Sequence, residues 1–533
     1  MEVDCISFRQ TGYFSNLICD YLSEKENLKP FYHRFPNLEA FQKQIQEKQQ
    51  TFPLENRSVL ARVLEEQYAG MDISKKTKSN IALLRDELTF TVVTGHQLNL
   101  FTGPLYFLYK IVSTIKLTEA LKKAYPQYHF VPVYWMATED HDFEEINYFN
   151  FRGKKLQWSK DASGAVGKLD TEGLDQVLEA FTQILEPGKN SDSLKALFEQ
   201  AYLENNDLSS ATRYLANELF KPYGLVILDA DDHRLKTLLT PYIKKDILEN
   251  SSFTKVTEAI AELRELDGQY NIQVNPREIN YFYLQDGLRE RIVEKDGKYQ
   301  VLNTELEFSR EQLVETIDSR PERFSPNVIT RPLYQEVILP NLCYIGGGGE
   351  LAYWLELKSS FEALEIPFPI LLLRNSAVLL SEKQGRKMEK LGLKASDLFL
   401  KQSSFINKKI REISNIEIDF SPQKQLLEEH FESLYELAEQ TDPSFLGAVK
   451  AQEVKQKKGL DHLEKRLLKA QKRKLKDQVI RMTDLQNDLF PNQSLQERNQ
   501  NFSELYLQLG DDLIPFLMKA LDPLQLEFLI AKY

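Results

Sequence analysis

Four short apolar segments, each followed directly by polar residues, constrain the fold of this chain more than any other feature. Residues 89–94 (TFTVVT), 129–136 (HFVPVYWM), 224–229 (GLVILD) and 368–373 (FPILLL) are apolar or β-branched, as buried parallel strands are. Helical stretches such as 203–219 and 352–364 lie between them. This alternation is typical of an α/β unit with a parallel sheet, in which ligands bind beyond the carboxyl ends of the strands.

Composition excludes several classes of protein. A chain of 533 residues with 42% hydrophobic residues can bury a large core in two to four structural units. Its net charge of −12 argues against a nucleic-acid partner, and its three cysteines exclude a disulfide scaffold. The strongest apolar run, residues 367–373, is far short of the ~20 residues of a spanning helix, and the first residues, MEVDC, are no export signal. We therefore expect a cytoplasmic protein without a membrane partner.

The last third of the chain differs from the rest. Residues 422–440 have helical spacing, with Ser421 placed to cap the helix, and a second helical pattern runs from about 444 to 489, its apolar register slipping at Leu475. Thr441-Asp442-Pro443 interrupts the two, so we expect an antiparallel helical hairpin or coiled coil. Residues 450–478 carry a local charge of +7, which fits either a solvated helix face or a surface for self-association or an anionic ligand.

Gly95-His96-Gln97 occupies a predicted strand-to-helix turn. The glycine lets a ligand approach the backbone, and the helix predicted from Pro104 offers free N–H groups to a phosphate. His96 could donate a hydrogen bond or a proton to such a phosphate, or simply cap the turn. Thr102 and Gly103, which precede Pro104, complete this candidate phosphate site.

Thr138–Asp142 (TEDHD) is the densest polar group in the chain. Glu139, Asp140 and Asp142 place three carboxylates around His141, and such crowding calls for a cation, a substrate amine or Mg²⁺ to offset the repulsion. The alternative is an acidic, solvated loop. Its position directly after an aromatic-rich strand favours a functional site.

A run of four glycines, residues 346–349, precedes a predicted helix. Gly347, Gly348 and Gly349 could cradle a phosphate with backbone amides, although the sequence matches neither the Walker A pattern nor G-x-G-x-x-G. Arg331 could clamp a carboxylate or phosphate, or form a structural ion pair. Cys343 has apolar neighbours and is most simply a buried thiol.

Four motifs, taken in order, resemble one family. They are TGHQ-x₃-FTGPLY at residues 94–106, WMATEDHD-x₂-EIN at 135–147, RFSPNVITRP at 323–332 and GGGGE-x₂-YW-x-ELK at 346–358. Together they resemble BshC, the family assigned the cysteine-adding step of bacillithiol biosynthesis. The resemblance covers almost the whole chain, including the helical hairpin.

The resemblance implies a Rossmann-like core related to nucleotidylyl transferases and class I synthetases, and a C-terminal coiled coil that forms a homodimer. It implies a ligase that joins cysteine to the amino group of glucosaminyl-malate, with ATP and Mg²⁺ activating the cysteine carboxylate. The pattern of the chain itself predicts an inserted α+β subdomain, because residues between about 235 and 345 contain hairpin-like segments at 281–284 and 292–302 with a turn at Asp296-Gly297. The expected parts of the chain are a helical N-terminal extension (1–85), the first part of the core (86–234), the inserted subdomain (235–345), the second part of the core (346–415), the helical hairpin (416–490) and a C-terminal helical segment (491–533).

The candidate site residues, matched to this chemistry as hypotheses, fall into three groups. The catalytic residues are His96, Asp140 and His141, with His141 as the base for the attacking amine. The substrate-binding residues are Gln97, Glu139, Asp142, Asn147, Arg331, Glu350, Tyr353 and Trp354. The nucleotide- or phosphate-binding residues are Gly95, Thr102, Gly103, Gly347, Gly348 and Gly349, and no metal ligands are assigned.

Two other functions remain open from the sequence. One is a metal-dependent hydrolase that uses the carboxylates and the histidine of residues 139–142 at its metal. The other is a dimeric ligand-binding or scaffold protein without catalysis, in which the acidic loop is structural.

Overall fold

The computed structural model describes residues 3–441 and 443–533. The chain forms two compact units. One comprises the residues up to Leu379 together with Leu495–Ala531 and Tyr533; the other comprises Leu380–Ser494 with Lys532. Each is described by itself.

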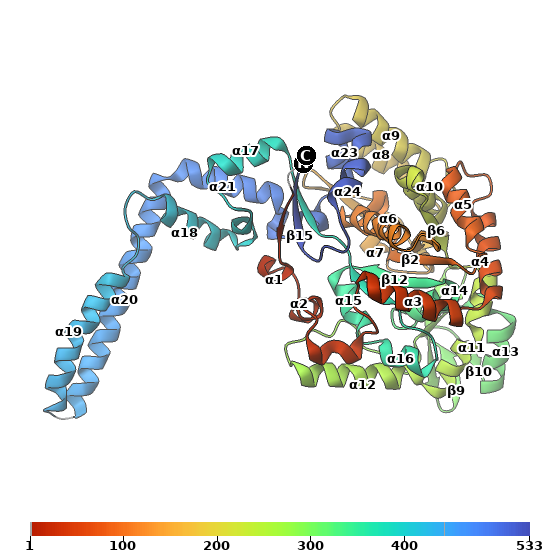
Figure 1. The fold of residues 1–533 in the computed structure, drawn as a ribbon, viewed down its shortest axis with the longest axis horizontal. Helices are drawn as coiled ribbons and strands as arrows, with labels where there is room; N and C mark the ends of the chain where they lie inside the picture. The colour runs from red at the N-terminus through yellow and green to blue at the C-terminus, as the bar shows by residue number, and fades with distance from the viewer. Residues whose placement is uncertain (1–2, 442) are drawn as a thin grey trace. The chain divides into compact units, whose positions relative to one another are not determined.

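A five-stranded parallel sheet forms the centre of the first unit (Figure 1). Its spatial order is β13 (Ile370–Leu373), β12 (Asn341–Gly346), β2 (Thr89–His96), β3 (His129–Met136) and β6 (Val226–Asp229). The predicted parallel sheet is confirmed. The direction of strand succession reverses between β2 and β12, and such a switch point opens a crevice at the carboxyl ends of the strands.

Strand β12 is the main correction to the predicted organisation. Residues 341–345 were expected in the inserted subdomain, yet β12 lies between β2 and β13 and is buried throughout. The apolar run is only four residues long, between Pro340 and the glycines, so its sequence pattern alone is too short to distinguish a strand from a turn.

Helices cover the sheet on its faces. α6 (Tyr106–Ala124) connects β2 to β3 and packs on both, and α3 (Leu38–Thr51) packs against β12. Phe41 and Ile45 of α3 share one core cluster with Val92, Leu117 and Ile345. The other helices before β2 are α1 (Phe8–Thr11), α2 (Asn16–Leu22), η1 (Glu26–Phe31), α4 (Leu54–Gln67) and α5 (Lys75–Leu83), and η2 (Leu100–Thr102) precedes α6.

The connection from β3 to β6 carries a small hairpin and a helical layer. The hairpin pairs β4 (Tyr148–Phe151) with β5 (Lys154–Gln157). The helices are α7 (Phe143–Ile146), η3 (Val166–Lys168), α8 (Leu174–Ile184), α9 (Lys189–Tyr202), α10 (Leu208–Phe220) and η4 (Lys221–Tyr223).

An α+β insertion follows β6. Its antiparallel sheet has the order β10 (Glu307–Phe308), β9 (Lys298–Val301), β8 (Leu288–Lys295), β7 (Tyr281–Gln285) and β11 (Phe324–Pro326). Asp296 and Gly297 both have positive φ, 53° and 77°, so the predicted turn between β8 and β9 is present. The helices are α11 (His233–Glu249), α12 (Ser251–Leu266), α13 (Arg310–Ser319), η5 (Pro321–Arg323) and α14 (Arg331–Ile338).

The two terminal segments, expected to be helical, also contain strands. β1 (Val3–Ile6), β15 (Phe528–Lys532) and β14 (Ala377–Leu380) form a three-stranded sheet in the order β1-β15-β14. Pairing between distant strands of this kind leaves no local signal in a single sequence. The neighbouring helices are α15 (Gly348–Trp354), α16 (Lys358–Ala363), α22 (Gln496–Asn499), α23 (Phe502–Leu509), η8 (Gly510–Asp512) and α24 (Leu513–Ala520).

The second unit is helical. α19 (Ser421–Glu439) and α20 (Pro443–Lys474) pair along their length around Phe431, Ala438 and Val449, which confirms the predicted hairpin (Figure 1). α20 ends just before Leu475, where the apolar register slips, and α21 (Lys476–Leu489) continues the chain. The unit also contains α17 (Glu382–Lys390), η6 (Ala395–Phe399), α18 (Gln402–Ile413) and η7 (Pro491–Gln493), so residues 380–415, expected in the core, belong here.

The start of α19 differs from the prediction, and part of the predicted turn is not described by the structure. Ser421 is the first residue of α19 rather than its cap, because its hydroxyl bonds Asp419 instead of a helix N–H. Asp442, at the predicted turn, lies outside the described residues. No helix in the described ranges combines the length and apolar character of a membrane span.

Candidate active site

A cavity of about 730 Å³ opens at the carboxyl ends of β2 and β12, at the switch point of the sheet. Its volume falls within the range of about 300–1,000 Å³ typical of ligand sites. Most of the predicted site residues line it: Gly95, His96, Gln97, Glu139, Asp140, His141, Arg331, Gly347, Gly348, Gly349, Glu350 and Tyr353.

Three predicted substrate-binding residues do not line this cavity. Trp354 is fully buried and stacks on Tyr344 with 4.5 Å between ring centroids, so it packs in the core. Asn147 is buried, and its carbonyl accepts the Trp158 N–H at 2.7 Å. Asp142 is exposed at the start of α7. The sequence spacing could not separate these residues from their neighbours that face the cavity.

An ion pair joins the two strand ends of the crevice. Lys110 Nζ of α6 lies 2.6 Å from Glu350 Oε2 and donates to the Gly95 carbonyl at 2.7 Å. Glu350 also accepts from the Tyr344 hydroxyl at 2.6 Å and from the Gly347 N–H at 2.8 Å. Burial raises the pKa of Glu350, but Lys110 and these hydrogen bonds outweigh it and hold that pKa at about 2. Glu350 therefore remains ionised and already uses one of the N–H groups expected to bind phosphate.

Arg331 lies at the first turn of α14 with its guanidinium over two aromatic rings. Its Cζ is 5.8 Å from the centroid of Trp135 and 5.7 Å from that of Tyr344. It donates to the Gln335 side chain and to the Tyr353 hydroxyl, both at 3.3 Å, and no described carboxylate forms an ion pair with it. A positioned guanidinium of this kind is suited to bidentate binding of a carboxylate or phosphate.

His96 is buried and electrically neutral. Burial and the nearby Lys110 lower its pKa to about 3. A backbone hydrogen bond with Thr102 opposes this shift, and Nε2 is buried without a hydrogen-bond partner, which together favour the Nδ1–H form of the neutral ring. A neutral ring keeps one N–H and one lone pair, so the role of His96 at a phosphate stays a prediction.

Thr102 and Gly103 form a strained turn and do not line the main cavity. Phe101, Thr102 and Gly103 have φ values of 48°, 68° and 61°, which are unfavourable for the first two side chains. Asn501 Nδ2 donates to the Phe101 and Gly103 carbonyls, both at 2.7 Å, and holds the turn from outside. Asn501 thereby fixes the turn that brings the Thr102 main chain to the His96 ring, and the phosphate contact of Thr102 and Gly103 stays a prediction.

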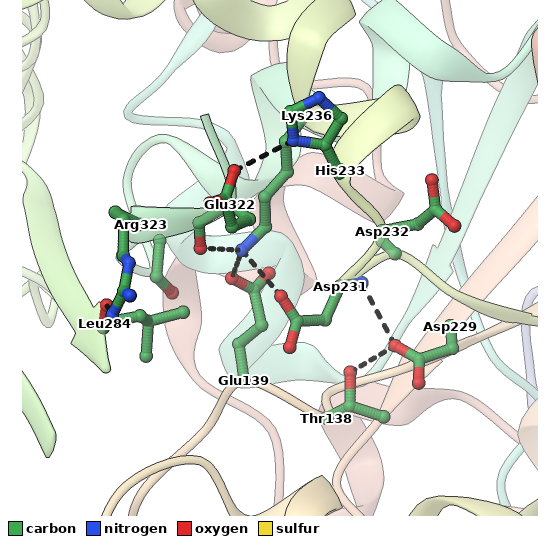
Figure 2. A network of polar contacts seen from close by, with 12 residues as sticks. Thr138, Glu139, Asp229, Asp231, Asp232, His233, Lys236, Leu284, Glu322 and Arg323 are labelled. Carbon is green, nitrogen blue, oxygen red and sulfur yellow. Dashed lines mark hydrogen bonds and ion pairs between the residues drawn. The ribbon is translucent and has the colours of Figure 1, made fainter. Parts of the chain in front are cut away.

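Glu139 faces a buried lysine rather than open solvent. Lys236 Nζ lies 2.6 Å from Glu139 Oε1 and 2.7 Å from Asp231 Oδ1, and it donates to the Glu322 carbonyl at 3.2 Å (Figure 2). Burial lowers the pKa of Lys236, but the two carboxylates outweigh it and raise that pKa. An internal ammonium thus occupies the position at which Glu139 was expected to hold a substrate ammonium.

Asp140 and His141 lie at the rim of the cavity. Asp140 Oδ2 accepts from Gln97 Nε2 at 2.9 Å, and its Oδ1 accepts the His141 N–H at 2.8 Å. Burial raises the pKa of Asp140, but these hydrogen bonds outweigh it and hold that pKa below its usual value. His141 Nδ1 lies 2.7 Å from Arg289 Nη1, so the lone pair expected to act as a base is engaged by a guanidinium.

Five cationic residues of the cavity were not among the predicted site residues. They come from distant segments: Lys110, Arg277, Arg289, Arg374 and Arg498. With Arg331 they make six cations against the carboxylates of Glu139, Asp140 and Glu350, so the cavity is positive in a chain of net charge −12. Of these five, only Arg374 directly follows a predicted strand, and this position is the one sequence feature that could have marked it as a site residue. The arrangement suits a substrate with carboxylate or phosphate groups.

The carboxylates of the TEDHD segment diverge. Glu139 turns to Lys236, Asp140 to Gln97, and Asp142 to solvent. Across the described residues, no three His, Cys, Asp or Glu side chains converge in a way that could hold a metal ion. The arrangement therefore gives a metal-dependent hydrolase no ligand set in this segment.

Comparison with known proteins places both units in one family. Residues 1–375 match the family described as "Bacillithiol biosynthesis BshC, N-terminal Rossmann-like domain", and residues 377–533 match "Bacillithiol biosynthesis BshC, C-terminal coiled-coil domain". Proteins named "Putative cysteine ligase BshC" from Christiangramia forsetii and Flavobacterium johnsoniae are 59% and 57% identical to this chain. The alignments cover 100% and 99% of this chain and 99% of each relative.

More distant relatives carry the same name. The protein from Bacillus cereus is 28% identical, with 97% of each chain covered. A solved structure from Campylobacter jejuni, titled a "putative arginyl t-RNA synthetase", is 12% identical, with 83% of this chain and 97% of that chain covered. Its TM-score of 0.21 is too low to support an argument about the fold.

Proposed function

The chain belongs to the BshC family, and from this membership we propose that it is a ligase that joins the carboxylate of cysteine to the amino group of glucosaminyl-malate. The relatives named as cysteine ligases match over their whole length. The observation that carries the proposal is the positive cavity at the switch point of the sheet. Such a cavity suits a reaction whose substrates all bear carboxylate or phosphate groups.

The energy for the amide bond would come from ATP with Mg²⁺. A carboxylate oxygen of cysteine attacks the α-phosphorus of ATP, pyrophosphate leaves, and a cysteinyl adenylate forms. The acceptor nitrogen then attacks the acyl carbon, AMP leaves, and the nitrogen loses one proton. We expect Mg²⁺ to arrive on the phosphates of ATP, because the described residues offer no converging ligand set.

The residues of the cavity suit distinct parts of this chemistry. Arg331 binds a substrate carboxylate, because it has no ion-pair partner of its own in the described chain. Asp140, at the rim of the cavity, receives an N–H group of the acceptor amine. Lys110 keeps Glu350 ionised and the glycine segment in place, while His141 orients Arg289 at the rim.

Isotope transfer tests the activation step. Cysteine labelled with ¹⁸O in its carboxylate is supplied with glucosaminyl-malate and ATP–Mg²⁺, and the nucleotide products are analysed by mass spectrometry. Adenylation transfers one ¹⁸O to AMP. Label in inorganic phosphate would show an acyl phosphate instead, and product formed without ATP would remove ATP from the proposal.

We also propose that the helical hairpin forms a homodimer, as the coiled-coil family match supports. A groove of about 510 Å³ on the hairpin is lined by Leu426, Leu427, Leu460 and Leu463, and Leu426 and Leu463 are more than half exposed. Light scattering should give twice the mass of one chain for the wild type and one chain mass for Leu426→Glu/Leu463→Glu. A monomeric wild type, or a dimer unchanged by both substitutions, would contradict the proposal.

The reaction would take place in the cytoplasm, where free cysteine remains reduced. All three cysteines of the chain are free, which is compatible with such a compartment.

A further inference from the structure

A second, smaller cavity adjoins the main one. It has a volume of about 310 Å³ and lies between the turn before α6, strand β4 and helix α22. Gln97, Tyr106 and Arg498 line both cavities. Gln97 stands at the boundary, because its Nε2 donates to Asp140 of the main cavity and to Glu145 of the smaller one, both at 2.9 Å.

The lining of the smaller cavity is rich in side-chain amides. They are those of Gln97, Asn99, Asn150 and Asn499, and Tyr148 adds an aromatic ring. The amide nitrogens of Gln97, Asn99 and Asn499 already donate within the chain, so their oxygens remain as acceptors for the hydroxyl groups of a sugar ring. Amides beside an aromatic surface therefore match a polyhydroxyl ring better than an apolar ligand or a lone ion.

Asn99 shows that this site is built for a ligand. Its side chain is 8% exposed, its Nδ2 donates to the Glu145 carbonyl at 3.2 Å, and its Oδ1 is buried without a partner. Gly103, with φ of 61°, makes room for it, because an added Cβ there would lie 2.6 Å from Asn99 Cβ. An unpaired buried acceptor is costly, and a ligand hydroxyl would satisfy it.

The charge of the smaller cavity selects against an anion. Glu145 supplies one carboxylate and Arg498 one guanidinium, so the lining is close to neutral. A phosphate placed here would meet Glu145, whereas the main cavity has an excess of cations. An uncharged polar ring is the ligand class that this balance favours.

We propose that the smaller cavity binds the sugar ring of the acceptor, with Asn99 Oδ1 accepting one ring hydroxyl and Gln97 marking the point where the sugar amine enters the main cavity. This inference rests on the proposed ligase function. Arg498, which borders both cavities, then lies close enough to the acceptor to meet its malate carboxylates.

Calorimetric binding measurements on the full chain test the subsite with glucosaminyl-malate and with malate alone as probes. We expect the wild type to bind glucosaminyl-malate more tightly than malate. Asn99→Leu and Asn150→Ala should each weaken glucosaminyl-malate binding at least about tenfold and leave malate binding unchanged. Asn303→Ala, which removes an exposed asparagine of the β-insertion, is the matched control and should change neither. Asn150→Ala is the milder variant should Asn99→Leu fail to fold.

The subsite would be overturned if the two variants bound both probes equally more weakly than the wild type, or bound both as tightly as the wild type. A wild type that binds neither would refute the proposed acceptor, and methyl α-D-glucosaminide then serves as the probe in saturation-transfer NMR. Transfer to the sugar that disappears in Asn99→Leu and Asn150→Ala would support the subsite independently of the ligase function. Absence of transfer in the wild type would overturn it.

Discussion

Lys110 Nζ lies 2.6 Å from Glu350 Oε2, and this ion pair ties the helix that follows β2 to the glycine segment that follows β12. The two residues meet at the switch point of the sheet, where the main cavity opens. Neither is exposed enough for the pair to be a surface contact, since their side chains are 4% and 29% exposed. The pair therefore both stabilises the first unit and shapes the proposed site.

Lys110→Met should destabilise the first unit by about 3 kcal/mol, because it leaves a largely buried carboxylate without its cation. Urea unfolding followed by tryptophan fluorescence measures this unit specifically, since Trp135, Trp158 and Trp354 all belong to it. Lys123→Met on the exposed end of the same helix should cost less than about 0.5 kcal/mol. Adding Glu350→Gln to Lys110→Met should recover part of the loss, and equal effects of Lys110→Met and Lys123→Met would refute the role of the pair.

His96 should make the first unit less stable at acidic pH. Its pKa of about 3 in the folded protein lies below the value of 6.5 expected after unfolding, so between these values only the unfolded chain binds the proton. Relative to His96→Asn, the wild type should lose up to about 1.4 kcal/mol per pH unit as the pH falls from 6.5 towards 3. If the free energy of unfolding had the same pH dependence in the two proteins, His96 would not be held neutral in the folded state.

Asn501 should fix which nitrogen of His96 carries the proton. Asn501→Ala removes two buried hydrogen bonds from the strained turn, so we expect a loss of about 2 kcal/mol and a turn that no longer brings the Thr102 main chain to the ring. Nitrogen-15 NMR of histidine-labelled protein distinguishes Nδ1–H from Nε2–H, and the chain has only seven histidines. The wild type should show His96 as the Nδ1–H form and the variant a mixture. An Nε2–H signal in the wild type would contradict the arrangement.

Lys236 should be required to keep Glu139 charged in the interior. Lys236→Met removes the ion pair of Glu139, whereas Asp231 keeps Lys168 Nζ at 3.3 Å, and we expect a cost of about 3–5 kcal/mol. Burial already raises the pKa of Glu139, so the variant should bind a proton on folding and lose further stability as the pH rises from 5 to 8. Lys244→Met, at an outer ion pair of the same helix, is the matched control. Equal losses for the two variants, without pH dependence, would contradict this account.

The strand ends could be predicted from the sequence because the signal is local. The segment 129–136 is the strand β3 with both ends as predicted, and the polar residues that follow β2, β3 and β12 meet at one edge of the sheet. Apolar runs and the polar residues directly after them are adjacent in the chain, so no knowledge of distant contacts was needed.

The partners of these residues could not be predicted in the same way. Glu139 is recognisable as a site residue because it lies in a dense polar segment. The lysine that neutralises it, Lys236, lies on a helix far along the chain, and no neighbouring sequence pattern distinguishes it. Lys110 sits within an ordinary helical pattern, and Asn501 reaches the His96 turn from the C-terminal segment. Long-range polar pairs are set by tertiary packing, which a single sequence does not reveal.

The most direct test of the account is mass-spectrometric detection of the amide product from cysteine, glucosaminyl-malate and ATP–Mg²⁺, with the wild type and Arg331→Gln compared side by side. We predict that the wild type forms the product mass only when all substrates are present. We predict that Arg331→Gln, with an unchanged unfolding curve, forms it at least about 100-fold more slowly, because the guanidinium has no other ion-pair partner in the described chain. Product formation at the wild-type rate by Arg331→Gln, or no product from the wild type, would contradict the central claim.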